Sequence, residues 1–111
     1  MLWAVHCLDG PDAAARRSAA RAAHSARLRA VGTDVRPVMY GRLVGGDESD
    51  AVGSLIVVEA ESRDQVERFV AEDPFVQAGV WREVRIDGFE PSTRSPVSLS
   101  GMPRTADDGA A

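Results

Sequence analysis

The chain has 111 residues, of which 44% are hydrophobic and 27% charged, and its formal net charge is −4. These values are typical of one soluble globular domain with a modest core, and the acidic balance argues against a nucleic-acid-binding surface. All 13 basic residues are arginines, so chemistry through a lysine Schiff base is excluded.

The first expected elements are a strand and a long helix. Residues 2–8 predict a strand, and a turn at 9–12 follows, with Asp12 as the expected N-cap of the helix. The helix is rich in Ala, Arg and Leu, and we expect it to run to about Val31, with Gly32 as the residue that stops it.

One face of this helix is mixed in character. Arg17, Arg21, His24, Leu28 and Val31 recur at helical spacing and therefore share that face. We expect the two aliphatic residues to anchor the face in the core and the cationic end to line a polar pocket at the edge of a sheet. The alternative packing face is a stripe of alanines, which gain less on burial: Ala15, Ala19, Ala22 and Ala26.

Two strands are expected next. Residues 35–40 predict a strand in which Pro37 cannot donate to the ladder, which indicates an edge position or a bulge. The acidic stretch at 45–50 lacks the spacing of a calcium-binding loop and is expected to be a solvated hairpin loop. Residues 53–59 contain a continuous aliphatic run, Leu-Ile-Val-Val, that is mostly β-branched and typical of a strand buried on both faces.

A second helix and a fourth strand complete the pattern. Ser62 and Gln65 carry the signature of a capping box that opens the helix, and Pro74 predicts its end near Glu72. Residues 81–89 alternate between apolar and polar and predict the last strand.

The order β-α-β-β-α-β predicts an α+β, ferredoxin-like fold, a four-stranded antiparallel sheet with two helices on one face. The other face needs a cover, and a second copy of the sheet is the usual solution, so we expect a homodimer. Residues 1–89 are the expected domain. Residues 90–111, rich in Pro, Ser and Gly, are the expected tail, either flexible or packed on the partner subunit.

The cellular compartment is predicted from cysteine usage and from the lack of an apolar run long enough to span a membrane. Cys7 is the single cysteine, so no internal disulfide is possible, and it is expected to be a small buried strand residue. No secretory pattern opens the chain and no apolar run approaches the roughly 20 residues that span a bilayer. We therefore expect a cytoplasmic protein without a membrane or nucleic-acid partner.

Five features occur in a characteristic order: the opening strand, Arg21-x-x-His24-x-x-x-Leu28, the Gly53-Ser54 strand start, Asp73-Pro74-Phe75 and Ala78-Gly79-Val80. Together they resemble the YciI-like (YCII-related) family over residues 1–89. The resemblance implies a dimeric α/β barrel of ferredoxin-like protomers and an active site in which His24 faces Asp73. Some members of the family are lyases or dehydrochlorinases that act on chlorinated aromatic breakdown products.

The chain departs from the family pattern beside the expected pocket. Gly41-Arg42 stands where the family commonly has Gly-Pro, and Tyr40 stands where smaller residues are usual. Both positions are expected near the pocket mouth, so the substrate can differ from that of close relatives.

The implied pair makes chemical sense. A carboxylate at Asp73 that accepts from one imidazole nitrogen of His24 fixes the tautomer and makes the other nitrogen a better general base. Arg21, one turn earlier, can hold an anionic group by a two-pronged contact, and Ser54 can add a hydrogen bond. The alternative is that His24 and Asp73 are only a structural tie between the first helix and the turn after the second.

Other candidates have simpler explanations. Arg17 and Arg27 are expected to be solvated helix charges, with Arg17 a second candidate for anion binding, and His6 is expected to be an ordinary sheet residue. The chain offers no glycine-rich nucleotide motif and no three or four convergent metal ligands, so neither a cofactor nor a metal is expected.

These features predict a small-molecule enzyme. His24 and Asp73 would perform acid/base chemistry of the lyase, isomerase or dehydrochlorinase type on a small, anionic organic substrate. The alternative is a non-catalytic dimeric module that binds a metabolite or a protein partner.

Overall fold

The computed structural model describes residues 1–30, 32–47, 50–97 and 99. Its elements in chain order are β1 (Leu2–Asp9), α1 (Ala14–Arg29), β2 (Arg36–Val44), β3 (Ala51–Glu59), α2 (Arg63–Ala71), α3 (Pro74–Gln77) and β4 (Trp81–Phe89). The predicted β-α-β-β-α-β order is confirmed. The short helix α3 is an addition that the sequence pattern had not indicated.

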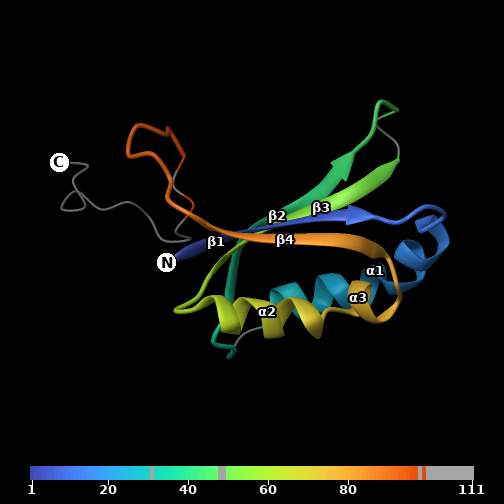
Figure 1. The fold of residues 1–111 in the computed structure, drawn as a ribbon, viewed down its shortest axis with the longest axis horizontal. Coiled ribbons are helices and arrows are strands. Elements are labelled where there is room, and N and C mark those ends of the chain that lie inside the picture. Colours follow the sequence, from blue (N-terminus) through green and yellow to red (C-terminus); the bar gives the residue numbers. More distant parts are fainter. Residues whose placement is uncertain (31, 48–49, 98, 100–111) are drawn as a thin grey trace.

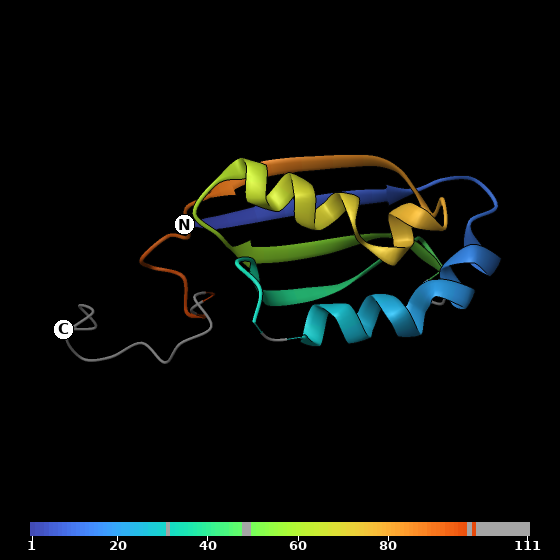
Figure 2. The same cartoon turned by 90° about the horizontal axis from the view of Figure 1, so that it is seen from below.

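The strands form one antiparallel sheet in the order β2-β3-β1-β4. All three helices lie on the same side of it (Figures 1 and 2). This is the ferredoxin-like arrangement. The central strands are β1 and β3. The polar residues of α1 meet the sheet where β1 ends and β3 begins.

Helix boundaries follow local chemistry at α2 but not at α1. Ser62 and Gln65 form the predicted capping box, and α2 ends at Ala71 with Glu72 as its C-cap. At α1, the prediction that Asp12 is the N-cap is wrong. Asp12 adopts a left-handed backbone conformation with φ of 59°, and Ala13 is the N-cap without a side-chain hydrogen bond.

The end of α1 also differs from the prediction. The helix stops at Arg29 because Ala30 is already extended, with φ −67° and ψ 146°. Gly32 has a positive φ of 89°, which suits glycine after a helix. Val31, predicted as the last core residue of the helix face, lies outside the described residues.

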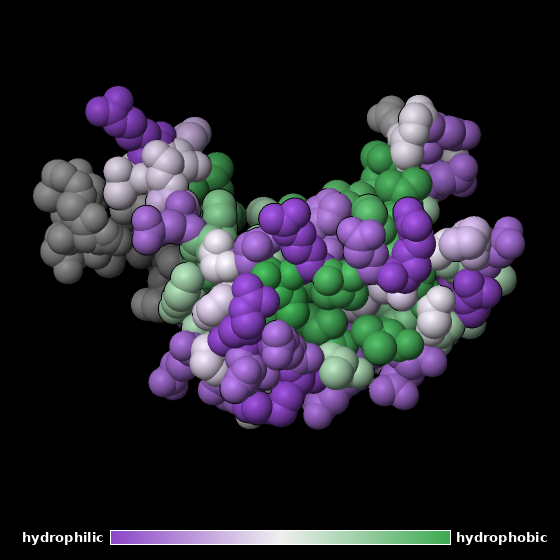
Figure 3. Space-filling model, in the orientation of Figure 1, coloured by the Kyte–Doolittle hydropathy of each residue, from purple (hydrophilic) through white to green (hydrophobic). Residues whose placement is uncertain are grey.

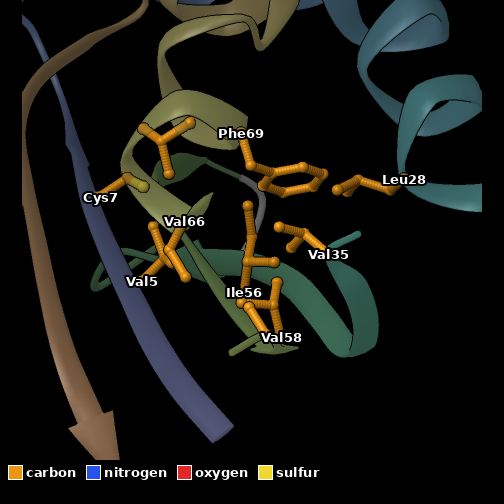
Figure 4. Close-up of a cluster of buried hydrophobic side chains, with 10 residues drawn as sticks. Val5, Cys7, Leu28, Val35, Ile56, Val58, Val66 and Phe69 are labelled. Carbon is orange, nitrogen blue, oxygen red and sulfur yellow. The ribbon is translucent and has the colours of Figure 1, made fainter. Parts of the chain in front are cut away.

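The apolar core lies between the sheet and the helices. Phe69 of α2 packs beside Leu28 of α1 and over Ile56 and Val35 (Figure 4). The prediction that β3 is buried on both faces is confirmed, since Ile56 is 1%, Val57 3% and Val58 0% exposed. A second apolar cluster of Ala13, Phe75 and Val80 lies at the opposite end of the layer.

The β2 strand is an edge strand, and its pairing with β3 shifts register between Pro37 and Met39. Pro37 therefore occupies both an edge and a bulge, as its missing N–H predicts. At the other end, the backbone of Gly53 approaches β1 so closely that a Cβ would lie 2.1 Å from the carbonyl oxygen of Cys7. Only glycine fits this position.

The sheet face that carries no helix is hollowed. Figure 3 shows the hollow between the β2–β3 hairpin and the residues that follow β4, with hydrophobic side chains on the hairpin wall. Met39 and Val44 of β2 and Val52 of β3 are more than 40% exposed. Within the described ranges, no helix combines the length and apolar character needed to cross a membrane.

Candidate active site

His24 lies in the middle of α1 on the face turned toward the sheet. It is only 8% exposed. Its ring stacks on Phe75 with centroids 3.9 Å apart and an interplanar angle of 13°, and the ring of Trp81 meets it edge-on at 5.8 Å. Because two aromatic rings hold the imidazole, its orientation is set by packing.

Asp73 is held by the turn between α2 and α3. It is the N-cap of α3, with Pro74 in the first turn, and its Oδ1 accepts a hydrogen bond of 2.8 Å from the backbone N–H of Phe75. The Nδ1 atom of His24 lies 2.7 Å from Oδ1 and 2.9 Å from Oδ2. With Asp73 1% exposed, this is a buried carboxylate–imidazole contact, and it leaves Nε2 as the nitrogen for exchange with a ligand.

Arg27 approaches the same carboxylate, which corrects the expectation of a solvated helix charge. Its side chain is 23% exposed, and its Nη1 atom lies 3.6 Å from Oδ2 of Asp73. The guanidinium covers the ring of Phe69 at 4.3 Å. Nη1 is buried and makes no hydrogen bond in the described part of the chain. Its position three residues after His24 could have indicated that Arg27 lies near Asp73, since residues three apart are neighbours on a helix.

Arg17 is the second arginine that was expected in solvent and is instead buried. Its side chain is 12% exposed and pairs with Asp9 through Nε at 2.8 Å and Nη2 at 3.0 Å. Nη2 also lies 2.9 Å from the carbonyl oxygen of Gly53 and 2.9 Å from the hydroxyl of Ser54. The guanidinium is 4.7 Å from the centroid of the Phe75 ring. Arg17 thus joins the end of β1 to the start of β3.

Arg21, Ser54, His24 and Phe75 line one cavity of about 200 Å³ together with six further residues: Arg17, Ser25, Tyr40, Gly41, Arg42 and Ile56. The volume suits a ligand of roughly one ring, since sites for drug-sized molecules start at about 300 Å³. Arg17, Arg21 and Arg42 also line an adjoining, more open pocket of about 670 Å³.

The structure therefore places His24, Asp73, Arg21 and Ser54 in one region. Ser54 is 3% exposed. Arg21 is exposed and, among the described residues, makes no ion pair or hydrogen bond, so its charge is available to a ligand. Tyr40 and Arg42, the departures from the family pattern, line the cavity as expected. In the described ranges, no group of three or more His, Cys, Asp or Glu side chains is arranged to hold a metal ion.

Comparisons with known proteins agree on the family. The YCII-related domain matches residues 1–90. Protein YciI of Escherichia coli O6:H1 is 30% identical in an alignment of 95 residues that covers 81% of this chain and 97% of that protein, and the Shigella flexneri protein gives the same values.

One solved structure gives a strong match. The 5-chloro-2-hydroxyhydroquinone dehydrochlorinase of Burkholderia phenoliruptrix, in complex with 2,5-dihydroxybenzoquinone, is 30% identical, with a TM-score of 0.73 over 83% of this chain and 96% of that chain. Sequence and structure comparisons thus point to the same group, and this chain belongs to the YCII-related family.

Proposed function

We propose that the chain is a small-molecule enzyme in which His24 is the general acid/base and Asp73 orients it. The observation that carries the proposal is the buried contact between Nδ1 of His24 and the carboxylate of Asp73. A neutral His24 that donates from Nδ1 has its lone pair on Nε2, which is the atom that must accept a proton from the substrate.

The substrate class follows from the cavity lining. Arg21 adds a cation without a partner among the described residues, and Ser54 and Tyr40 add hydroxyls, so the cavity suits a small molecule with anionic oxygens. The related dehydrochlorinase binds 2,5-dihydroxybenzoquinone, a planar ring with acidic hydroxyls. A ring of this kind agrees with the size of the cavity and with its cationic lining.

The reaction class is proton transfer coupled to elimination. Nε2 of His24 removes a proton from the substrate, and the electron pair of the broken bond forms a new π bond within the ring system. The leaving group departs with its own bonding pair as an anion, for example chloride. The proton then passes from the imidazolium to water, which returns His24 to its starting form.

We further propose that the enzyme is a homodimer built on the helix-free sheet face. Support comes from the hollow and its hydrophobic wall on the β2–β3 hairpin in Figure 3. Three apolar side chains of these two strands are also more than 40% exposed: Met39, Val44 and Val52. Sheets with an apolar face are stable only when that face is covered. Light scattering after gel filtration should give twice the chain mass, and Met39→Glu should shift it toward the monomer. A monomeric wild-type chain at micromolar concentration would contradict the dimer.

The test of the chemistry is turnover of 5-chloro-2-hydroxyhydroquinone, followed as chloride release. His24→Asn should keep the fold by circular dichroism and lower kcat by about 10²–10⁴-fold. His6→Asn, at the chain's other histidine, is the matched control and should retain the wild-type rate. A folded His24→Asn protein with unchanged kcat would contradict the proposal. Binding of 2,5-dihydroxybenzoquinone without any chloride release from the chlorinated ring would instead identify a non-catalytic binding module.

A further inference from the structure

Both lone pairs of the Ser54 hydroxyl are occupied by hydrogen bonds. Its Oγ atom lies 2.9 Å from Nη2 of Arg17 and 3.3 Å from Nε1 of Trp81. Guanidinium and indole nitrogens only donate, so the serine is the acceptor in both hydrogen bonds. A hydroxyl has two lone pairs and one proton. These two donors therefore leave Ser54 with its proton alone for any further contact.

That proton has no acceptor in the described part of the chain. Ser54 is 3% exposed, and no other hydrogen bond of its hydroxyl is present among those residues. A buried donor without an acceptor is costly unless water or a ligand supplies one. Ser54 lines the same cavity as His24, so the cavity is the place from which an acceptor can come.

The donor role is reinforced by charge. The Nε and Nη2 atoms of Arg17 both donate to the carboxylate of Asp9, which holds the guanidinium beside the Ser54 oxygen. Nη2 has two hydrogens for three acceptors, namely Asp9, Gly53 and Ser54, so one hydrogen is shared. A hydroxyl that accepts from a cation is polarised and becomes a stronger donor.

We propose that Ser54 donates a hydrogen bond to an anionic oxygen of the ligand, and that Arg17 and Trp81 are the positioning residues that hold it in this role. The inference rests on the proposed function, because it places the ligand in the cavity that His24 lines. It also narrows the ligand class to a ring with a deprotonated enol or phenol oxygen. Ser54 holds that oxygen while His24 exchanges a proton elsewhere on the ring. An ammonium group at that position is excluded, since its nitrogen has no lone pair to accept the serine proton.

The two tryptophans allow the contact to be followed directly. The chain has only Trp3 and Trp81, and the indole of Trp3 donates to the carbonyl oxygen of Ala60 at 3.1 Å, outside the cavity. In a ¹H–¹⁵N spectrum, Ser54→Ala should move one indole N–H signal, which assigns it to Trp81. Titration with 2,5-dihydroxybenzoquinone should then move the Trp81 signal in a saturable way and leave that of Trp3 in place.

Variants test whether the Ser54 hydroxyl itself contributes to binding. Ser54→Ala should weaken binding of this probe by about 10-fold or more, as expected for a lost hydrogen bond to a charged group. Ser95→Ala, the matched control at an exposed serine outside the cavity lining, should change it by less than about 2-fold. Arg17→Gln should weaken binding as well, and the double variant should lose no more than Ser54→Ala alone. A merely structural role of Arg17 would make the two losses add.

Three outcomes decide the matter. Saturable binding that depends on Ser54 but not on Ser95 supports the inference. Equal affinity of the wild type and Ser54→Ala overturns it, while the chloride-release assay on His24 still judges the proposed function separately. Absence of a saturable shift of either indole signal in the wild-type protein overturns the inference too, because an anionic ring oxygen would then not reach Ser54.

Discussion

Two parts of α1 bury opposite kinds of side chain against the same sheet. In its last two turns, Leu28 packs into the apolar cluster with Val35, Ile56 and Phe69. Nearer its start and in its middle, Arg17 and His24 occupy the same face, and each meets a carboxylate that is less than 10% exposed. One helix face thus serves a core at one end and a polar site at the other.

The comparison shows how polar groups are tolerated inside a chain of this size. The apolar end is stabilised by area removed from water. The polar end is tolerable because Arg17 and His24 each have a carboxylate partner, and the ring of Phe75 contacts both of them. A side chain truncated at the first end leaves a cavity. At the second, removal of one partner leaves the other polar group buried without its counterpart.

The largest expected effect is at the apolar end. Phe69→Ala should lower the free energy of unfolding by about 3–5 kcal/mol, because it removes a buried ring and leaves a cavity. Urea denaturation measures it, and Phe89→Ala, at the half-buried end of β4, is the control with a smaller loss. A loss below about 1 kcal/mol for Phe69→Ala would mean that this end is not the main core.

The polar end is tested by its ion pair. Asp9→Asn should lower the free energy of unfolding by about 3 kcal/mol, since Arg17 then remains buried without its counter-charge. Arg17→Met leaves the opposite charge unpaired and should have a similar cost. The double variant should lose clearly less than the sum of the two. Additive losses in urea melts would show that the pair is not a coupled unit.

Two variants of Asp73 distinguish its contribution to stability from its contribution to catalysis. Asp73→Asn keeps an oxygen for the N–H of Phe75 but loses the charge that faces His24, so kcat should fall while stability changes little. Asp73→Ala also removes the cap of α3 and should cost about 1 kcal/mol more in thermal or urea unfolding. Equal stability of the two variants would contradict the capping role, and wild-type kcat in Asp73→Asn would contradict the role in orientation.

The smallest effect is at Cys7, where the two regions meet, and it appears only at alkaline pH. Burial raises the pKa of the Cys7 thiol from 9.0 to about 12, with Asp73 and Asp9 adding to the rise and Arg17 opposing it. Between these values the unfolded chain loses the thiol proton and the folded chain keeps it. Stability is therefore complete below pH 9 and falls as pH rises, by at most about 1.4 kcal/mol per pH unit from this group.

Cys7→Ala isolates that contribution. The variant should show a shallower decline of the free energy of unfolding above pH 9 than the wild type, on top of a constant offset from the smaller side chain. Urea melts at several pH values measure both slopes. Parallel slopes would mean that the thiol titrates alike in the folded and unfolded chains.

Much of the fold could be predicted because its signals are local. The capping box at Ser62, the edge role of Pro37 and the span of β4 all depend on a few neighbouring residues, and all are confirmed. The start of α1 was missed because Asp12 suits an N-cap, yet the turn from β1 places it in a left-handed conformation. The helix α3 was missed because it has only four residues, too few to show a repeating helical pattern in the sequence.

The sequence by itself determined the order of the elements and the face of α1 that meets the sheet, because helical spacing decides which side chains lie together. Its family resemblance also singled out His24 and Asp73, which the structure brings into contact. Only the tertiary structure decided the state of the arginines. Arg17 and Arg27 look alike in sequence to any solvated helix charge. Their side chains are only 12% and 23% exposed because Asp9 and Asp73, on other elements, lie beside them. A local sequence pattern does not predict contacts between residues so far apart in the chain.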